Sequence, residues 1–119
     1  MQWLRPLYIG TKMKRDRKKA AAAVTGRKPG RYDGCILLVL SDYAHCSVEF
    51  LPVYSFKIPH FAVRKPAKAV GLAKDREEAC ELLVSMTEDA CLRVGTPDLA
   101  AYFASFPESE WAERWEDSV

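Results

Sequence analysis

The sequence lacks the short motifs that mark the commonest enzyme and metal sites. It contains no Gly-x-Ser-x-Gly nucleophile motif, no phosphate-binding Walker loop and no Gly-x-Gly-x-x-Gly dinucleotide motif. It has two histidines, and none of its four cysteines belongs to a Cys-x-x-Cys pair. We therefore expect no catalytic residue, no cofactor and no metal ligand set.

Long hydrophobic runs are also missing. The longest strongly apolar run, 35–40, is far shorter than the roughly 20 residues that cross a bilayer. The segment 1–10 contains Arg5 and Pro6 and has neither the apolar region nor the cleavage site of a secretory signal. We expect no membrane partner, no export and a cytoplasmic location.

The composition is that of one folded domain. Of the 119 residues, 49% are hydrophobic and 29% are charged, a balance typical of folded chains. A chain of this length has room for one core and hardly for two. We expect a single α+β domain over residues 1–106, followed by an acidic tail over 107–119 whose deletion leaves a folded domain.

Charge is divided unevenly along the chain. Residues 1–32 carry ten Lys and Arg against one acid, and residues 33–119 carry eight against fifteen, so the net charges are +9 and −7. Six of the basic residues fall within 12–19. This asymmetry predicts an anionic partner for the basic end, or neutralisation of the two ends by each other within the fold.

Residues 12–25 have the pattern of an amphipathic helix. Thr11 suits the N-cap and Gly26 the end. At about 100° per residue, Met13 falls with small side chains on a narrow arc, and the cations fill the rest of the circumference. We expect a helix that packs against the sheet and exposes its positive charges.

Three short segments have the patterns of β-strands. The apolar run 35–40 predicts a strand buried on both faces at the centre of the sheet. Residues 46–50 alternate and predict its hairpin partner, and 67–73 predict a third strand. Residues 54–61 fit either a strand or a short helix. The expected sheet is small, three-stranded and mainly antiparallel.

Two further helices are expected after the third strand. Asp75 and Glu78 fit a capping box at the start of a helix over 75–93, and Gly95 ends it. Pro97 suits the first position of a short third helix. The expected order of elements is therefore α-β-β-β-α-α.

The joint between the third strand and its helix is also a candidate phosphate site. A glycine before a helix start can expose backbone donors to an anion. Asp75, Glu77 and Glu78, however, place negative charge in the first turn and already use the helix dipole. We expect this joint to be structural.

Several segments resemble those of other proteins. They are LYIG at 7–10 followed by the basic helix, then PGRYDGCILLVLS, EFLP and VGLAKDREEACELL. Together, over about residues 7–103, they resemble a group of small bacterial α/β proteins without a characterised function. These motifs describe joints between strands and helices, so the resemblance implies an outline of the fold and transfers no catalytic residue.

The expected order α-β-β-β-α also resembles that of double-stranded RNA-binding domains, which read the shape of a duplex across its minor groove. In that family a lysine cluster begins the helix after the sheet. Here that helix begins with KDREEA and the cluster lies on the first helix. The chain departs from the family at its binding motif, so the family is not assigned.

The basic segment is the strongest candidate binding site. Phosphate contacts from Lys and Arg give affinity without sequence information. Three interpretations stay open: a solvated or self-neutralised face, a nucleic-acid surface, or a surface for an acidic protein. The cations concerned are Lys12, Lys14, Arg15, Arg17, Lys18, Lys19, Arg27, Lys28 and Arg31.

The acidic tail offers a second candidate surface. Trp111 and Trp115 lie one helical turn apart among carboxylates. Either both indoles complete the core, or they dock into the groove of a protein partner. We favour a non-enzymatic binding module that uses the basic helix, with a protein-interaction module that uses the tail as the alternative, and an enzyme third.

The cysteines are expected to be buried, reduced thiols. They are separated by 11, 34 and 11 residues, and the two in the second predicted helix, Cys80 and Cys91, would lie about 16 Å apart along it, too far to share one ion. The native protein should therefore carry neither stoichiometric zinc nor a disulfide. Metal analysis and intact mass under non-reducing conditions would measure this, and one zinc per chain would contradict it.

Overall fold

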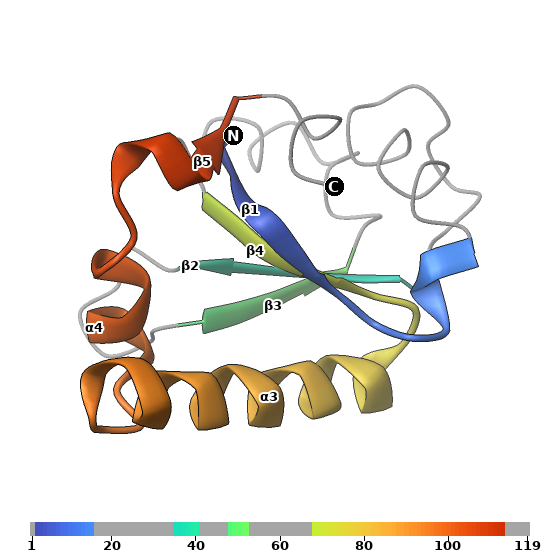
Figure 1. Cartoon of the computed structure of the whole chain (residues 1–119). Helices are drawn as coiled ribbons and strands as arrows, with labels where there is room; N and C mark the ends of the chain where they lie inside the picture. Colours follow the sequence, from blue (N-terminus) through green and yellow to red (C-terminus); the bar gives the residue numbers. More distant parts are fainter. Residues whose placement is uncertain (1, 16–34, 41–47, 53–67, 114–119) are drawn as a thin grey trace.

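A five-stranded mixed sheet forms the centre of the structure, a computed structural model that describes residues 2–15, 35–40, 48–52 and 68–113 (Figure 1). The elements are β1 (Gln2–Ile9), the 3₁₀ turn η1 (Met13–Arg15), β2 (Ile36–Leu40), β3 (Val48–Pro52), β4 (Lys68–Ala73), α3 (Arg76–Val94), α4 (Leu99–Ala104), the 3₁₀ turn η3 (Glu108–Glu110) and β5 (Trp111–Ala112).

The strands follow the order β3-β2-β4-β1-β5 across the sheet. β1 and β4 are parallel, and the pairs β2–β3, β2–β4 and β1–β5 are antiparallel. Leu38 of β2 lies opposite Phe50 of β3 on one side and Gly71 of β4 on the other. The register between β1 and β4 shifts between Trp3 and Tyr8, a stretch that includes the cis peptide bond Arg5–Pro6.

One face of the sheet is covered by α3 and α4 (Figure 1). The buried residues of α3 recur every three or four positions, which places them on one side of the helix. Gly71 allows the close approach of this helix to the sheet, because a Cβ there would lie 3.1 Å from the Cε of Met86. The buried side chains on this face are Leu4, Leu38, Val70, Ala73, Ala79, Leu82, Met86, Ala90, Tyr102, Phe103 and Trp111.

A second core cluster lies on the opposite face, because successive side chains of a strand point to opposite sides. It includes Trp3 and Leu7 of β1, Leu37 and Val39 of β2, and Met13 of η1. The first turn of the basic segment is therefore attached to the core through Met13, as the sequence pattern predicted.

The ends of both helices carry local caps. Asp75 is the N-cap of α3, and its carboxylate accepts a hydrogen bond from the backbone N–H of Glu78 at 2.9 Å. Gly95 ends α3 with φ of 80°, a left-handed conformation that favours glycine. The sequence predicted both ends of α3. The predicted start of α4 is wrong, because Pro97 was expected at the first helical position, whereas Asp98 is the N-cap and Pro97 precedes it.

The predicted three-stranded, mainly antiparallel sheet in the order α-β-β-β-α-α is wrong. The described elements follow the order β-β-β-β-α-α-β, within an α+β architecture. β1 was missed because Arg5 and Pro6 are both exposed and interrupt its alternation. β5 has two residues, too few to show a period. Because β1 pairs with the far side of β4, the middle strand is β4 and not β2. The antiparallel pairing of β2 with β3 is confirmed.

The segment that was predicted to form the basic helix begins with a 3₁₀ turn. The backbone N–H groups of Met13 and Lys14 donate to the carbonyl of Gly10 at 3.0 and 3.1 Å. Residues 16–25 of the predicted helix, and the ambiguous segment 54–61, lie outside the described residues.

Trp111 is a core residue of the sheet. It is 7% exposed and, as part of β5, pairs with Leu4 of β1. The Nζ of Lys68 lies over its ring, 4.7 Å from the centroid. β5 lies beyond the boundary at residue 106 that the sequence analysis proposed. Of the two interpretations of this indole, the structure places Trp111 in the core.

Replacing Trp111 should destabilise the protein strongly. Trp111→Ala removes a large buried side chain and should lower the free energy of unfolding by about 3–5 kcal/mol. Leu92→Ala is the control, because Leu92 is 87% exposed, and should change it by less than about 0.5 kcal/mol. Denaturant unfolding of both variants measures the difference, and equal midpoints would show that Trp111 contributes nothing to the core.

Candidate functional site

The candidate site lies where the carboxyl ends of β1 and β4 meet. These two strands are parallel and adjacent, so η1 and the first turn of α3 follow them at the same end of the sheet (Figure 1). The backbone N–H of Gly10 donates to the carbonyl of Leu72 at 3.0 Å. This bond continues the pairing of the two strands into the segment that carries the first cations.

The carboxylate of Glu78 joins the two segments at this end. It is 3% exposed and accepts hydrogen bonds from the backbone N–H groups of Lys12 at 2.8 Å, Met13 at 3.2 Å and Lys74 at 3.1 Å. Charge-assisted bonds of this kind are the stronger class, and a buried carboxylate requires them. We call Glu78 with these three N–H donors the Glu78 anchor.

Gly10 leaves the space that the Glu78 anchor occupies. A Cβ at this position would lie 1.8 Å from Oε1 and 2.0 Å from Cδ of Glu78. These distances are far shorter than any van der Waals contact, so any larger side chain would move the carboxylate. The glycine of LYIG and the second glutamate of KDREEA are therefore two parts of one arrangement.

The predicted capping box is half correct. Asp75 caps the helix as predicted, but Glu78 does not return a bond to Asp75; it accepts from Lys74 and from the turn after β1. Glu78 accepts from the N–H of Lys12, at the start of the turn, and shares the N–H of Met13 with the carbonyl of Gly10. Its carboxylate takes the donors that an anion would need, which agrees with a structural role for the joint.

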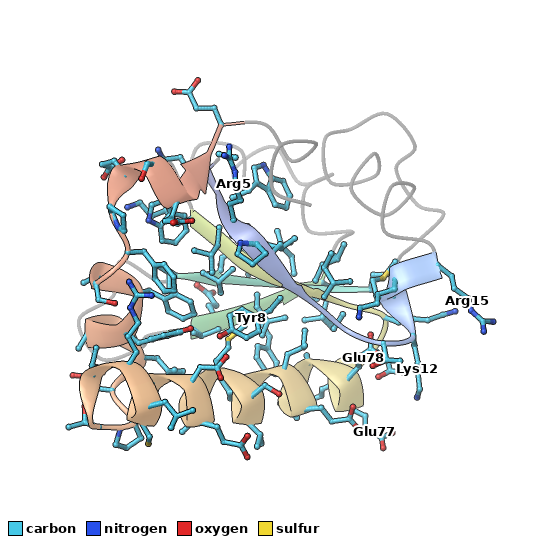
Figure 2. All side chains as sticks on the ribbon, viewed as in Figure 1. Arg5, Tyr8, Lys12, Arg15, Glu77 and Glu78 are labelled. Carbon is cyan, nitrogen blue, oxygen red and sulfur yellow. The ribbon has the colours of Figure 1, made fainter. Side chains whose placement is uncertain are left out.

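Three cations of the predicted binding surface are described, and all three are exposed: Lys12, Lys14 and Arg15. Figure 2 shows Lys12 and Arg15 at the end of the sheet where Glu78 lies, with the side chain of Arg15 pointing outward. The Nζ of Lys12 lies 3.7 Å from the Oδ2 of Asp75, and the two side chains are 59% and 46% exposed. A surface pair of this kind contributes about 0–1 kcal/mol, so it leaves Lys12 available to a ligand.

Of the other residues on the two candidate surfaces, one is described by the structure. Trp111 is buried and not on a docking surface. The remaining members lie outside the described residues: Arg17, Lys18, Lys19, Arg27, Lys28, Arg31 and Trp115.

A polar cluster that the sequence did not suggest connects β1, α3 and α4. The hydroxyl of Tyr8 donates to Oδ2 of Asp89 at 2.5 Å and lies 2.8 Å from the hydroxyl of Tyr102. Burial, and then the hydrogen bonds to Asp89 and Tyr102, raise the pKa of Tyr8 above its usual range. The phenol therefore keeps its proton and acts as a donor rather than a base. Its partners are far apart in sequence, so no local pattern identifies them.

The described cysteines do not form a metal site. Cys35 is buried, as predicted, whereas Cys80 and Cys91 are exposed. The prediction of burial is wrong for the last two because they lie about 100° around α3 from Ala79 and Ala90, which face the sheet. Within the described ranges, no three His, Cys, Asp or Glu side chains are placed to hold one ion. Both histidines and Cys46 lie outside these ranges.

Comparisons of the chain with protein-family models, with curated proteins and with solved structures gave no match. In the part of the chain that the structure describes, neither helix combines the length and apolarity needed to cross a membrane.

The Tyr8 cluster should make the stability depend on pH in the alkaline range. Tyr8→Phe should lower the free energy of unfolding by about 1–2 kcal/mol near neutral pH, because Asp89 and Tyr102 lose a partner. An unfolded tyrosine ionises near pH 10, and the folded pKa of Tyr8 is higher. The stabilisation is thus complete below about pH 10 and is lost as the pH rises above it.

Urea unfolding at a series of pH values measures this effect. Above about pH 10, the stability of the wild type should fall more steeply than that of Tyr8→Phe. Tyr102→Phe is the control, since it keeps the bond between Tyr8 and Asp89 and should retain the steeper fall. Parallel curves for the wild type and Tyr8→Phe would contradict the assignment.

Proposed function

We propose that this chain is a non-enzymatic binding module that contacts nucleic-acid phosphates through its basic segment, residues 12–19. The observation that supports this most directly is the fixed start of the segment. Met13 is 1% exposed, and the Glu78 anchor holds the N–H groups of Lys12 and Met13. The side chains of Lys12, Lys14 and Arg15 consequently project from a rigid end of the sheet.

The chemistry of these side chains favours phosphate over base recognition. Lys and Arg on a surface turn bind phosphate oxygens and position a duplex without reading its sequence. The sequence continues with Arg17, Lys18 and Lys19, which add charge to the same segment. Such binding releases counterions, so the affinity depends steeply on salt.

The alternative functions have less support. The protein-interaction module relied on two exposed indoles, and Trp111 is buried in β5. An acidic protein partner would use the same cations as a nucleic acid, and competition between the two ligands would reveal it. The sequence motifs that would favour an enzyme are absent.

The proposal predicts a specific salt dependence. If four cations engage phosphates, the slope of log affinity against log salt should be about −3.6, at about −0.9 for each phosphate. Replacing Lys14, Arg15, Lys18 and Lys19 with Gln should weaken binding to all duplex sequences about equally, and Gln is compatible with helical structure. Fluorescence anisotropy of a labelled duplex at several salt concentrations measures both quantities.

A pair of single variants provides the matched control. Arg15→Gln and Arg5→Gln remove the same charge from exposed positions at different ends of the described structure (Figure 2). Arg15→Gln should reduce the slope by about 0.9 and Arg5→Gln should leave it unchanged. Equal effects would show that only net charge matters, and a wild type without binding at low salt would refute the proposed function.

A further inference from the structure

We infer that Glu78 is the positioning residue of the basic segment: its carboxylate orients the turn from which the phosphate-binding cations project, and it does not touch the ligand. The inference rests on the proposed function and adds a residue of opposite charge to the site. Glu78 belongs to α3, whereas the cations follow β1, so the role depends on a contact between segments far apart in the sequence.

The geometry of the Glu78 anchor supports this role. Two of its three donors, the N–H groups of Lys12 and Met13, belong to the start of the basic segment itself. The third, from Lys74, belongs to the joint that leads into α3. A single carboxylate therefore fixes the direction in which the segment leaves β1, relative to a helix that packs on the sheet.

A substitution at Gly10 can disturb the Glu78 anchor without changing the charge of the site. An alanine at this position would place its Cβ within 1.8–2.3 Å of three atoms of the Glu78 side chain. Two of these atoms belong to the carboxyl group and the third is Cγ, so the side chain of Glu78 must shift to make room. Gly10→Ala thus moves the Glu78 carboxylate away from the N–H groups of Lys12 and Met13 without removing a charge.

Positioning and simple electrostatics predict opposite results for the loss of Glu78. A carboxylate beside a phosphate-binding surface repels the ligand, so its neutralisation should strengthen binding if charge alone decides. If Glu78 holds the turn in its binding geometry, neutralisation leaves the turn to be ordered during binding, and the affinity falls.

The deciding experiment compares Glu78→Gln with Glu77→Gln and Gly10→Ala in the intact chain, with a labelled duplex at fixed salt. Glu77 is the matched control because it is exposed, lies in the same turn and loses the same charge. We expect Glu78→Gln and Gly10→Ala to weaken binding about three- to tenfold, the effect of ordering a few residues on binding. Glu77→Gln should bind as tightly as the wild type or more tightly.

Amide hydrogen exchange of Lys12 and Met13 separates this inference from the proposed function. In both Glu78→Gln, which leaves one acceptor oxygen for three donors, and Gly10→Ala, which displaces the carboxylate, the proton of Lys12 should exchange at least about tenfold faster than in the wild type. The proton of Met13 should change less, because it also donates to the carbonyl of Gly10. In Glu77→Gln both protons should exchange at the wild-type rate.

Each outcome decides one of the two proposals. Unchanged exchange, or binding by Glu78→Gln that equals or exceeds that of Glu77→Gln, overturns the positioning role and leaves phosphate binding in place. A wild type that does not bind the duplex overturns the proposed function, and the role of Glu78 in binding with it. Faster exchange together with weaker binding in both Glu78→Gln and Gly10→Ala supports both.

Discussion

The structure depends on one buried carboxylate. β1 and β4 are parallel neighbours, and parallel strands have no tight turn to hold their ends together. Here Glu78 supplies that connection, since it accepts N–H donors from the residues after each strand. The dependence is mutual: burial of the charge would be costly without these donors, and the N–H of Lys12 would lose its acceptor without the carboxylate. Gly10 is the steric condition for both.

β1 is held against α3 at a second point. Tyr8 bonds Asp89 about three turns further along the helix, and Tyr102 brings α4 to the same place. Between these two polar contacts, Ala79 and Met86 of α3 face the sheet. β1, β4 and α3 are thereby joined by both polar contacts, and the exposed cations of η1 directly follow the first of them. These contacts are the physical basis for the proposed positioning role of Glu78.

The sequence predicted what local patterns encode. The pairing of β2 with β3, the extent of α3, the cap at Asp75 and the end at Gly95 all follow from neighbouring residues. β1 was not predicted because Arg5 and Pro6 interrupt its alternation of buried and exposed residues. β5 was not predicted because two residues are too few to show a period. The site was identified only in part, since the cations are visible in the sequence while the donors to Glu78 lie 65 and 66 positions away from it. A capping box predicts that a glutamate accepts a hydrogen bond from a backbone N–H a few residues away. No local rule predicts that it also accepts hydrogen bonds from the segment after another strand.

The pairing of β1 also has a consequence for how the chain reaches its fold. β1 pairs with β4 through Gln2 and Lys68, and with β5 through Trp3 and Ala112. It is therefore synthesised well before the strands with which it pairs. Long-range pairing of this kind raises the contact order and slows folding. Until those partners emerge, Trp3, Leu4 and Leu7, which are buried in the finished sheet, are apolar surface that a nascent-chain chaperone can recognise.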